Sequence, residues 1–169
     1  KHLDTPIDFD NLLAEGSMMG SGGMIVMDED DCMVSVSRFY LDFTVEESCG
    51  KCTPCRIGNK RLLEMLNKIT EGRGTMKDLD ALSTLGKVIK DTALCGLGQT
   101  SPNPVLSTLN NFYDEYVEHV RDKTCRAKQC KALLTYTINP ELCIGCHLCF
   151  KHCPADAILG DVRKPHVIN

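Results

Sequence analysis

The stretch Ser48-Cys49-Gly50-Lys51-Cys52-Thr53-Pro54-Cys55-Arg56 decides how this chain is organised. Its three cysteines stand three residues apart, a spacing that rarely meets the geometry that disulfides require. The same Cys-x2-Cys-x2-Cys spacing wraps three corners of a [4Fe-4S] cube. A fourth thiolate has to come from elsewhere, and Cys95 is the next cysteine along the chain. We therefore predict one cluster site made by Cys49, Cys52, Cys55 and Cys95.

A single zinc ion held by the same four thiolates is the alternative for this site. Zinc sites usually bring their cysteines in pairs, whereas this sequence offers a triplet and a single residue. The spacing therefore favours the iron cluster over zinc.

The composition narrows the class of protein. The chain has 169 residues, a net charge of −4, no tryptophan and 5% aromatic residues. So few large aromatic side chains predict a thin core that inorganic centres help to stabilise. The negative charge argues against nucleic acid as the main partner. No apolar run approaches the length of a membrane span, and no signal peptide is visible.

Eleven cysteines occur in the sequence, an odd number that is unevenly spaced. A secreted scaffold held by disulfides would be shorter and its cysteines more even. Metal-bound thiolates instead imply a reducing compartment, and we expect the cytoplasm.

A second cysteine motif lies near the end of the chain. Residues 143–154 read Cys-Ile-Gly-Cys-His-Leu-Cys-Phe-Lys-His-Cys-Pro, which is the bacterial ferredoxin run Cys-x2-Cys-x2-Cys-x3-Cys-Pro without a mismatch. A short helix is expected over residues 155–158, and a returning strand over residues 166–168. The motif predicts a ferredoxin-like α+β segment.

The ligands of this segment follow the rule for two-cluster ferredoxins, in which the fourth cysteine of one run ligates the other cluster. We expect Cys143, Cys146 and Cys149 to hold a second [4Fe-4S] cluster whose fourth ligand is missing. Cys153 would serve a further cluster whose other ligands are missing, because no second run follows before Asn169. The alternative is that all four cysteines form one site.

Three cysteines remain, and a histidine stands near two of them. His119, Cys125 and Cys130 read His-x5-Cys-x4-Cys, and Cys32 completes a set of three thiolates and one imidazole. Such a set makes a closed tetrahedral zinc site. The alternative is a buried apolar Cys32 and a solvated His119 at a helix C-terminus.

Apolar periodicity predicts a mainly α fold with four amphipathic helices. The helices are expected from about Cys32 to Glu47, from Pro54 to about Thr70, after the capping box Thr75–Asp78, and from Asn103 to about Arg121. The predicted organisation has four parts. Residues 1–31 are the end of an upstream domain, with a strand at Met24–Met27. Residues 32–122 are a four-helix bundle that carries the first cluster. Residues 123–139 are a hinge held by the zinc site, with a strand over residues 132–138, and residues 140–169 are the incomplete ferredoxin-like segment.

The motif Glu46–Gly58, with a distant fourth ligand at Cys95, resembles the cluster-binding region of the NADH-binding flavoprotein subunit of respiratory complex I. The extra ferredoxin run and the stretch Leu97–Val105 make the resemblance more specific. Together they resemble the NADH-binding beta subunit of multimeric, electron-bifurcating [FeFe] hydrogenases and related NADP-reducing hydrogenases. The likeness covers essentially all of this chain but only the C-terminal part of that subunit.

The resemblance implies that FMN and NAD(P)H bind in an upstream domain, and that the partners are a hydrogenase catalytic subunit and a thioredoxin-like [2Fe-2S] subunit. The chain is then expected to relay electrons within an NADH-dependent oxidoreductase. No catalytic nucleophile–base pair stands out, so this segment alone is predicted to transfer electrons only. The alternatives are a diaphorase subunit of complex I or of an NAD-dependent formate dehydrogenase, and a docking module with zinc in every site.

Overall fold

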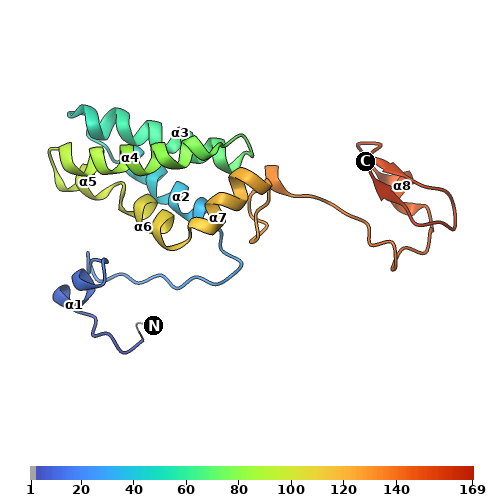
Figure 1. Ribbon diagram of the computed structural model, residues 1–169, viewed down its shortest axis with the longest axis horizontal. Coiled ribbons are helices and arrows are strands. Elements are labelled where there is room, and N and C mark those ends of the chain that lie inside the picture. Colours follow the sequence, from blue (N-terminus) through green and yellow to red (C-terminus); the bar gives the residue numbers. More distant parts are fainter. Residues whose placement is uncertain (1–2) are drawn as a thin grey trace.

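The computed structural model describes residues 3–169, so that residues 1 and 2 of the predicted upstream part lie outside the described residues. Figure 1 shows an N-terminal arm, a group of packed helices, and a small C-terminal unit at the end of an extended linker. The protein is mainly helical, as predicted, and its described strands are two short ones in the C-terminal unit.

The packed helices follow one another with short connections. They are α2 (Met33–Glu46), η1 (Pro54–Gly58), α3 (Asn59–Thr70), α4 (Met76–Thr92), α5 (Gly96–Thr100), α6 (Asn103–Asn111), α7 (Tyr113–Val117) and η2 (Glu118–Asp122). Helix α2 packs against α3 and α6, and α4 packs against both of these helices. The predicted second helix is continuous from Pro54 to Thr70, but its first turn is a wider π-helix, η1.

The core between these helices is aliphatic, as the lack of tryptophan predicts. Leucine and isoleucine recur at helical spacing on α3 and α4, so each helix turns one apolar stripe inward. The largest fully buried side chains outside the metal centres are Tyr116, Leu41, Leu62, Leu66, Ile69, Leu79, Leu82 and Ile89. Removing such side chains from water stabilises the packed helices by roughly 1.5–3 kcal/mol each.

The predicted fourth helix is interrupted. The backbone of Phe112 leaves the helical region at φ −129° and ψ 37° and separates α6 from α7. Helix α7 then widens into the π-helical turn η2, which ends at Lys123 in the left-handed conformation. Apolar periodicity predicts the helical segment correctly, but it does not report a break at a single residue. The break separates α6 from the segment that carries His119.

The predicted capping box at the start of α4 is confirmed. The backbone N–H and hydroxyl of Thr75 both donate to one carboxylate oxygen of Asp78 at 2.6 Å, and Lys68 donates to both carboxylate oxygens at 2.8 Å. Burial would raise the pKa of Asp78, but the bonds from Lys68 and Thr75 outweigh it and hold that pKa below its ordinary 3.8.

Asp78→Asn is therefore expected to lower the free energy of unfolding by about 1 kcal/mol at pH 7. Since the folded-state pKa is lowered, this stability is present above the ordinary pKa and is lost as the pH falls through the folded value. Thermal unfolding at pH 7 and at pH 2.5 tests it. The gap between the two proteins should close in acid, and a gap of the same size at both pH values would contradict the assignment.

The predicted strand at Met24–Met27 is wrong. Residues 23–28 have no regular structure, and Met24, Ile25 and Val26 are among the most exposed apolar side chains of the described residues. A strand requires a neighbour to pair its backbone groups, and no strand of the described chain lies beside this stretch. The arm does contain a short helix, α1 (Phe9–Ala14).

The predicted strand over residues 132–138 is also wrong. A 3-10 turn, η3 (Lys131–Leu133), is followed by residues 134–139, which have no regular structure and form the extended linker of Figure 1. The C-terminal unit contains α8 (Leu148–His152) and an antiparallel pair, β1 (Ile158–Leu159) and β2 (Val167–Ile168). The α+β prediction is thus confirmed, as is the returning strand. The helix expected over residues 155–158 is wrong, because Ile158 pairs with Ile168 in the sheet.

Among the described residues, no helix is both long enough and apolar enough to cross a membrane.

Candidate metal centres

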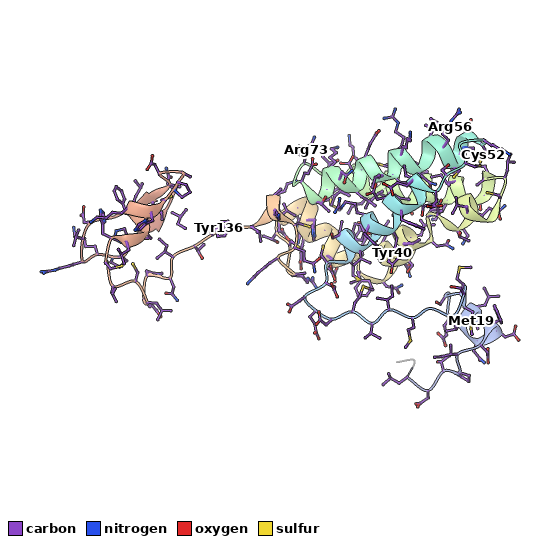
Figure 2. All side chains as sticks on the ribbon, turned by 180° about the vertical axis from the view of Figure 1, so that it is seen from behind. Met19, Tyr40, Cys52, Arg56, Arg73 and Tyr136 are labelled. Carbon is purple, nitrogen blue, oxygen red and sulfur yellow. The ribbon has the colours of Figure 1, made fainter. Side chains whose placement is uncertain are left out.

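The first cysteine motif forms a tight turn at one end of the packed helices. Figure 2 shows Cys52 and Arg56 at this end, with Arg73 and the linker residue Tyr136 toward the other. Gly50 has φ +74°, a left-handed conformation that favours glycine. Cys55 is buried, while Cys49 is exposed. The motif therefore offers thiols that line the surface of the turn and one that reaches into the core.

The segment around Cys95 lies against this turn. The backbone of Leu94 bonds to the sulfur of Cys52, and this bond is the main cause of the lowered pKa of that thiol. Cys95 is the N-cap of α5, and a Cβ built on Gly98 of that helix would lie 3.2 Å from Cβ of Cys55. The segment that carries Cys95 thus lies beside the turn that carries the other three cysteines, and sulfur donors of this kind suit an iron-sulfur cube.

Gly98→Ala tests this contact. The added Cβ would come within 2.6 Å of Ala93 and 3.2 Å of Cys55, so it should push α5 away from the motif and lower the iron retained at this site at least twofold. Gly86→Ala is the matched control, because its Cβ crowds Leu106 and Pro102 but no cysteine. Iron per chain is the measurement. Equal iron loss in both variants would show that general destabilisation is the cause.

The structure gathers all four predicted residues of the mixed site, Cys32, His119, Cys125 and Cys130. Their ligand atoms lie within 4.8 Å of one another, and all four side chains are buried. The sulfurs of Cys32 and Cys130 are 3.8 Å apart, and His119 Nε2 is 3.3 and 3.4 Å from them. Zn–S and Zn–N bonds of about 2.3 and 2.05 Å in a tetrahedron give edges of about 3.8 Å between sulfurs and about 3.6 Å between sulfur and nitrogen. The set therefore has the size of a one-ion site.

The charges in this site are arranged for a cation. Hydrogen bonds with Cys130 and His119 lower the pKa of Cys32 to about 4, against the effect of burial. Burial would lower the pKa of His119, but its bond to Cys32 raises that pKa to about 9. The bond to Cys32 and burial raise the pKa of Cys130. Without a metal, protons thus compensate a buried thiolate, and a bound cation would replace them.

The imidazole of His119 is also fixed on the side that faces away from the sulfurs. Its Nδ1 lies 2.7 Å from the carbonyl oxygen of Glu115, one helical turn earlier. A carbonyl only accepts, so Nδ1 donates and Nε2 faces the sulfurs, where its lone pair would bind a metal once the cation replaces the Nε2 proton. This is the usual support of a metal-binding imidazole.

The C-terminal unit is built around His166, which is fully buried. Its backbone N–H lies 3.4 Å from the sulfur of Cys143, and its Nε2 lies 2.8 Å from Nδ1 of His147. The backbone N–H of Ala157 similarly reaches the sulfur of Cys153 at 3.4 Å. Gly145 is required here, because it has φ +68° and a Cβ would lie 2.5 Å from the backbone of Lys164. Cys143 and Cys153 therefore receive N–H donors from residues that follow the motif.

Residues 35–119 match the profile of the NADH-ubiquinone oxidoreductase-F iron-sulfur binding region, which covers half of the chain. The chain belongs to this family. Residues 136–159 also match the profile of the 4Fe-4S binding domain. Within the mixed site, His119 falls inside the matched residues 35–119, whereas Cys32, Cys125 and Cys130 lie outside them.

The relatives that this chain resembles are named as hydrogenase or NADH-quinone oxidoreductase proteins. The chain is 62% identical to NADP-reducing hydrogenase subunit HndC of Solidesulfovibrio fructosivorans over 98% of its own length, and 39% identical to the NADH-quinone oxidoreductase F protein of Streptomyces coelicolor over 74%. It covers 34% and 28% of these proteins, and thus spans about a third of their length. It also resembles the crystal structure of NAD+-reducing [NiFe]-hydrogenase in the H2-reduced state, with a TM-score of 0.55 and 29% identity over 57% of this chain and 16% of that one.

Sequence reasoning missed the polar residues behind the thiols. Ser48 lies 3.2 Å from the sulfur of Cys55, and Asn59 donates to the same sulfur at 3.5 Å. His166 was placed only in the returning strand over residues 166–168. A lone histidine at the start of a short strand gives no spacing signal, whereas Ser48 directly precedes Cys49 and was within reach of local reasoning.

Proposed function

We propose that this chain is the electron-relay part of an NAD(P)H-linked oxidoreductase subunit that passes electrons between an upstream FMN site and the iron-sulfur clusters of partner subunits in an electron-bifurcating hydrogenase complex. The observation that carries this proposal is the meeting of the Cys49–Cys55 turn with the Cys95 segment. The family and the hydrogenase relative support it.

The helices α2, α3, α4 and α6 form the four-helix unit that holds the first cluster between Cys49, Cys52, Cys55 and Cys95. A [4Fe-4S] cluster, when bound, supplies reversible one-electron transfer with little change of geometry. The chain's own contribution is to fix the four thiolates, to aim N–H donors at their sulfurs and to place the positive charge of Lys51 and Arg56 nearby. Donors and positive charge stabilise the added electron, so they favour reduction.

One zinc ion alone at this first site is less well supported. In residues 3–169, the mixed site is the one group of at least three Cys, His, Asp and Glu side chains gathered tightly enough for one ion. The thiols of the Cys49 motif and Cys95 are spread more widely, as ligands at the corners of a larger cluster have to be.

Cys143, Cys146 and Cys149 belong to a second [4Fe-4S] cluster, and Cys153 to a further one whose remaining ligands are supplied outside this chain. The zinc ion of Cys32, His119, Cys125 and Cys130 is structural. It ties the start of α2 to the loop after η2 and so fixes the place where the linker leaves the packed helices. All eleven cysteines are free, which suits a reducing compartment, the cytoplasm.

The partners follow from the hydrogenase names of the relatives, and we place a catalytic hydrogenase subunit and a thioredoxin-like [2Fe-2S] subunit beside this chain. A complex I diaphorase is the second candidate, since the NADH-quinone oxidoreductase relative matches over 74% of the chain. The match of HndC over 98% of the chain favours the hydrogenase.

Metal identity at each site tests the proposal. The complete polypeptide that contains this chain is purified without oxygen, iron and zinc are counted, and EPR spectra are recorded before and after reduction. We expect broad visible absorbance that bleaches on reduction, a [4Fe-4S] signal and one zinc per chain. A colourless protein that contains zinc alone would overturn the relay in favour of a docking module.

A further inference from the structure

A buried polar network lies directly behind Cys55. Asn59 is 0% exposed and Ser101 is 4% exposed, within a core that is mostly aliphatic. Asn59 Nδ2 lies 3.5 Å from the Cys55 sulfur, and the Ser101 hydroxyl lies 2.9 Å from Asn59 Oδ1 and 2.9 Å from the carbonyl oxygen of Gly98. Burying a carboxamide is unfavourable unless its hydrogen bonds are made, so this pair requires an explanation.

The network has one orientation when Cys55 is a thiolate. A thiolate sulfur accepts hydrogen bonds and donates none, so the amide N–H of Asn59 faces it and the amide oxygen faces away. The Ser101 hydroxyl can donate to that oxygen, which holds the amide in this orientation. A flipped amide would instead place its oxygen against the negatively charged sulfur.

The same network joins both ligand-bearing segments. Asn59 begins α3, one turn after Cys55, whereas Ser101 ends α5, the helix that Cys95 caps. The two residues are 42 positions apart in the chain. This contact fixes the position of one segment relative to the other. It also places a hydrogen-bond donor against the sulfur of Cys55.

We propose that Asn59, oriented by Ser101, is a positioning residue that sets the reduction potential of the first cluster through its hydrogen bond to the Cys55 sulfur. The inference rests on the proposed iron-sulfur site. Reduction adds negative charge to the cluster and its sulfurs, so an N–H donor stabilises the reduced form more than the oxidised form. Losing the donor therefore lowers the potential.

The test is a redox titration followed by EPR on the complete polypeptide and on its Asn59→Leu variant. At a fixed solution potential, the ratio of reduced to oxidised cluster should fall about tenfold, which is about 59 mV for a one-electron couple. Ser101→Ala should shift the potential in the same direction by less, because Asn59 remains but is no longer held. Ser101→Thr keeps the hydroxyl and should restore the original potential.

Ser37→Ala is the matched control. Ser37 is 0% exposed and bonds to Thr108 and Tyr116, in a network without cysteine. It should destabilise the helices and leave the potential unchanged. If Asn59→Leu does not retain its cluster, Ser101→Ala alone decides.

An unchanged potential in the variants that retain the cluster, or an equal shift in Ser37→Ala, would overturn the role of Asn59. The proposed function would fail differently, because the unsubstituted protein would then give no cluster signal at all.

Discussion

Cys95→Ala is expected to remove the intact cube from the first site. The substitution leaves Cys49, Cys52 and Cys55 with no fourth thiolate, because the other cysteine thiols of the chain belong to the mixed site and the C-terminal unit. A cube needs all four corners held, so iron per chain should fall and the [4Fe-4S] signal assigned to this site should disappear. Iron analysis and EPR of the reduced protein measure both.

The control for this variant is Thr100→Ala. Thr100 lies on the same helix, is half-buried, and its hydroxyl donates to the carbonyl oxygens of Gly96 and Leu97 rather than to a cysteine. It should retain all iron. An unchanged [4Fe-4S] signal in Cys95→Ala would exclude Cys95 as a ligand, and the fourth corner would then have to be sought elsewhere.

Cys130→Ser has the largest expected effect on stability. Structural zinc sites have apparent binding free energies of about 10–16 kcal/mol, and the site folds together with its metal. The variant should lose its one zinc ion per chain. For a chain of this length a loss of about 5 kcal/mol lowers the unfolding temperature by roughly 10–20 °C. A chelator applied to the unsubstituted protein should reproduce the shift, because it removes the same ion.

Leu133→Ala is the control that separates the effect of zinc loss from the effect of lost packing. Leu133 is buried beside the same loop, and its truncation should cost about 2–5 kcal/mol while leaving zinc in place. Zinc content and the thermal midpoint are measured together. A Cys130→Ser protein that keeps stoichiometric zinc, or one that loses zinc without any change in its midpoint, would show that the ion does not hold the fold.

Motifs with short spacings could be predicted from the sequence. The turn around Cys49–Cys55, the capping box of Asp78 and the ferredoxin run each place chemistry within a few residues, where spacing fixes geometry. The mixed site was harder, since Cys32 and His119 are 87 positions apart. It was predicted by elimination, from the cysteines that no other motif used.

The polar contact between Asn59 and Ser101 could not be predicted from the sequence. The absence of a strand at Met24–Met27 could not be predicted either. Asn59 and Ser101 look like ordinary helix residues, and only the fold brings them together behind Cys55. Met24–Met27 has the composition of a strand, but composition does not supply the neighbour with which a strand pairs. In both cases the missing information lies in distant parts of the chain.

Helix α2 separates the two kinds of metal centre, since Cys32 caps its first turn and Cys49 follows its last. Its 14 residues rise by about 21 Å. The six residues 134–139 of the linker, fully extended, reach about 20–22 Å. The tether is thus as long as this helix, so shortening it by a few residues is expected to change the distance between the proposed clusters of the C-terminal unit and the proposed first cluster.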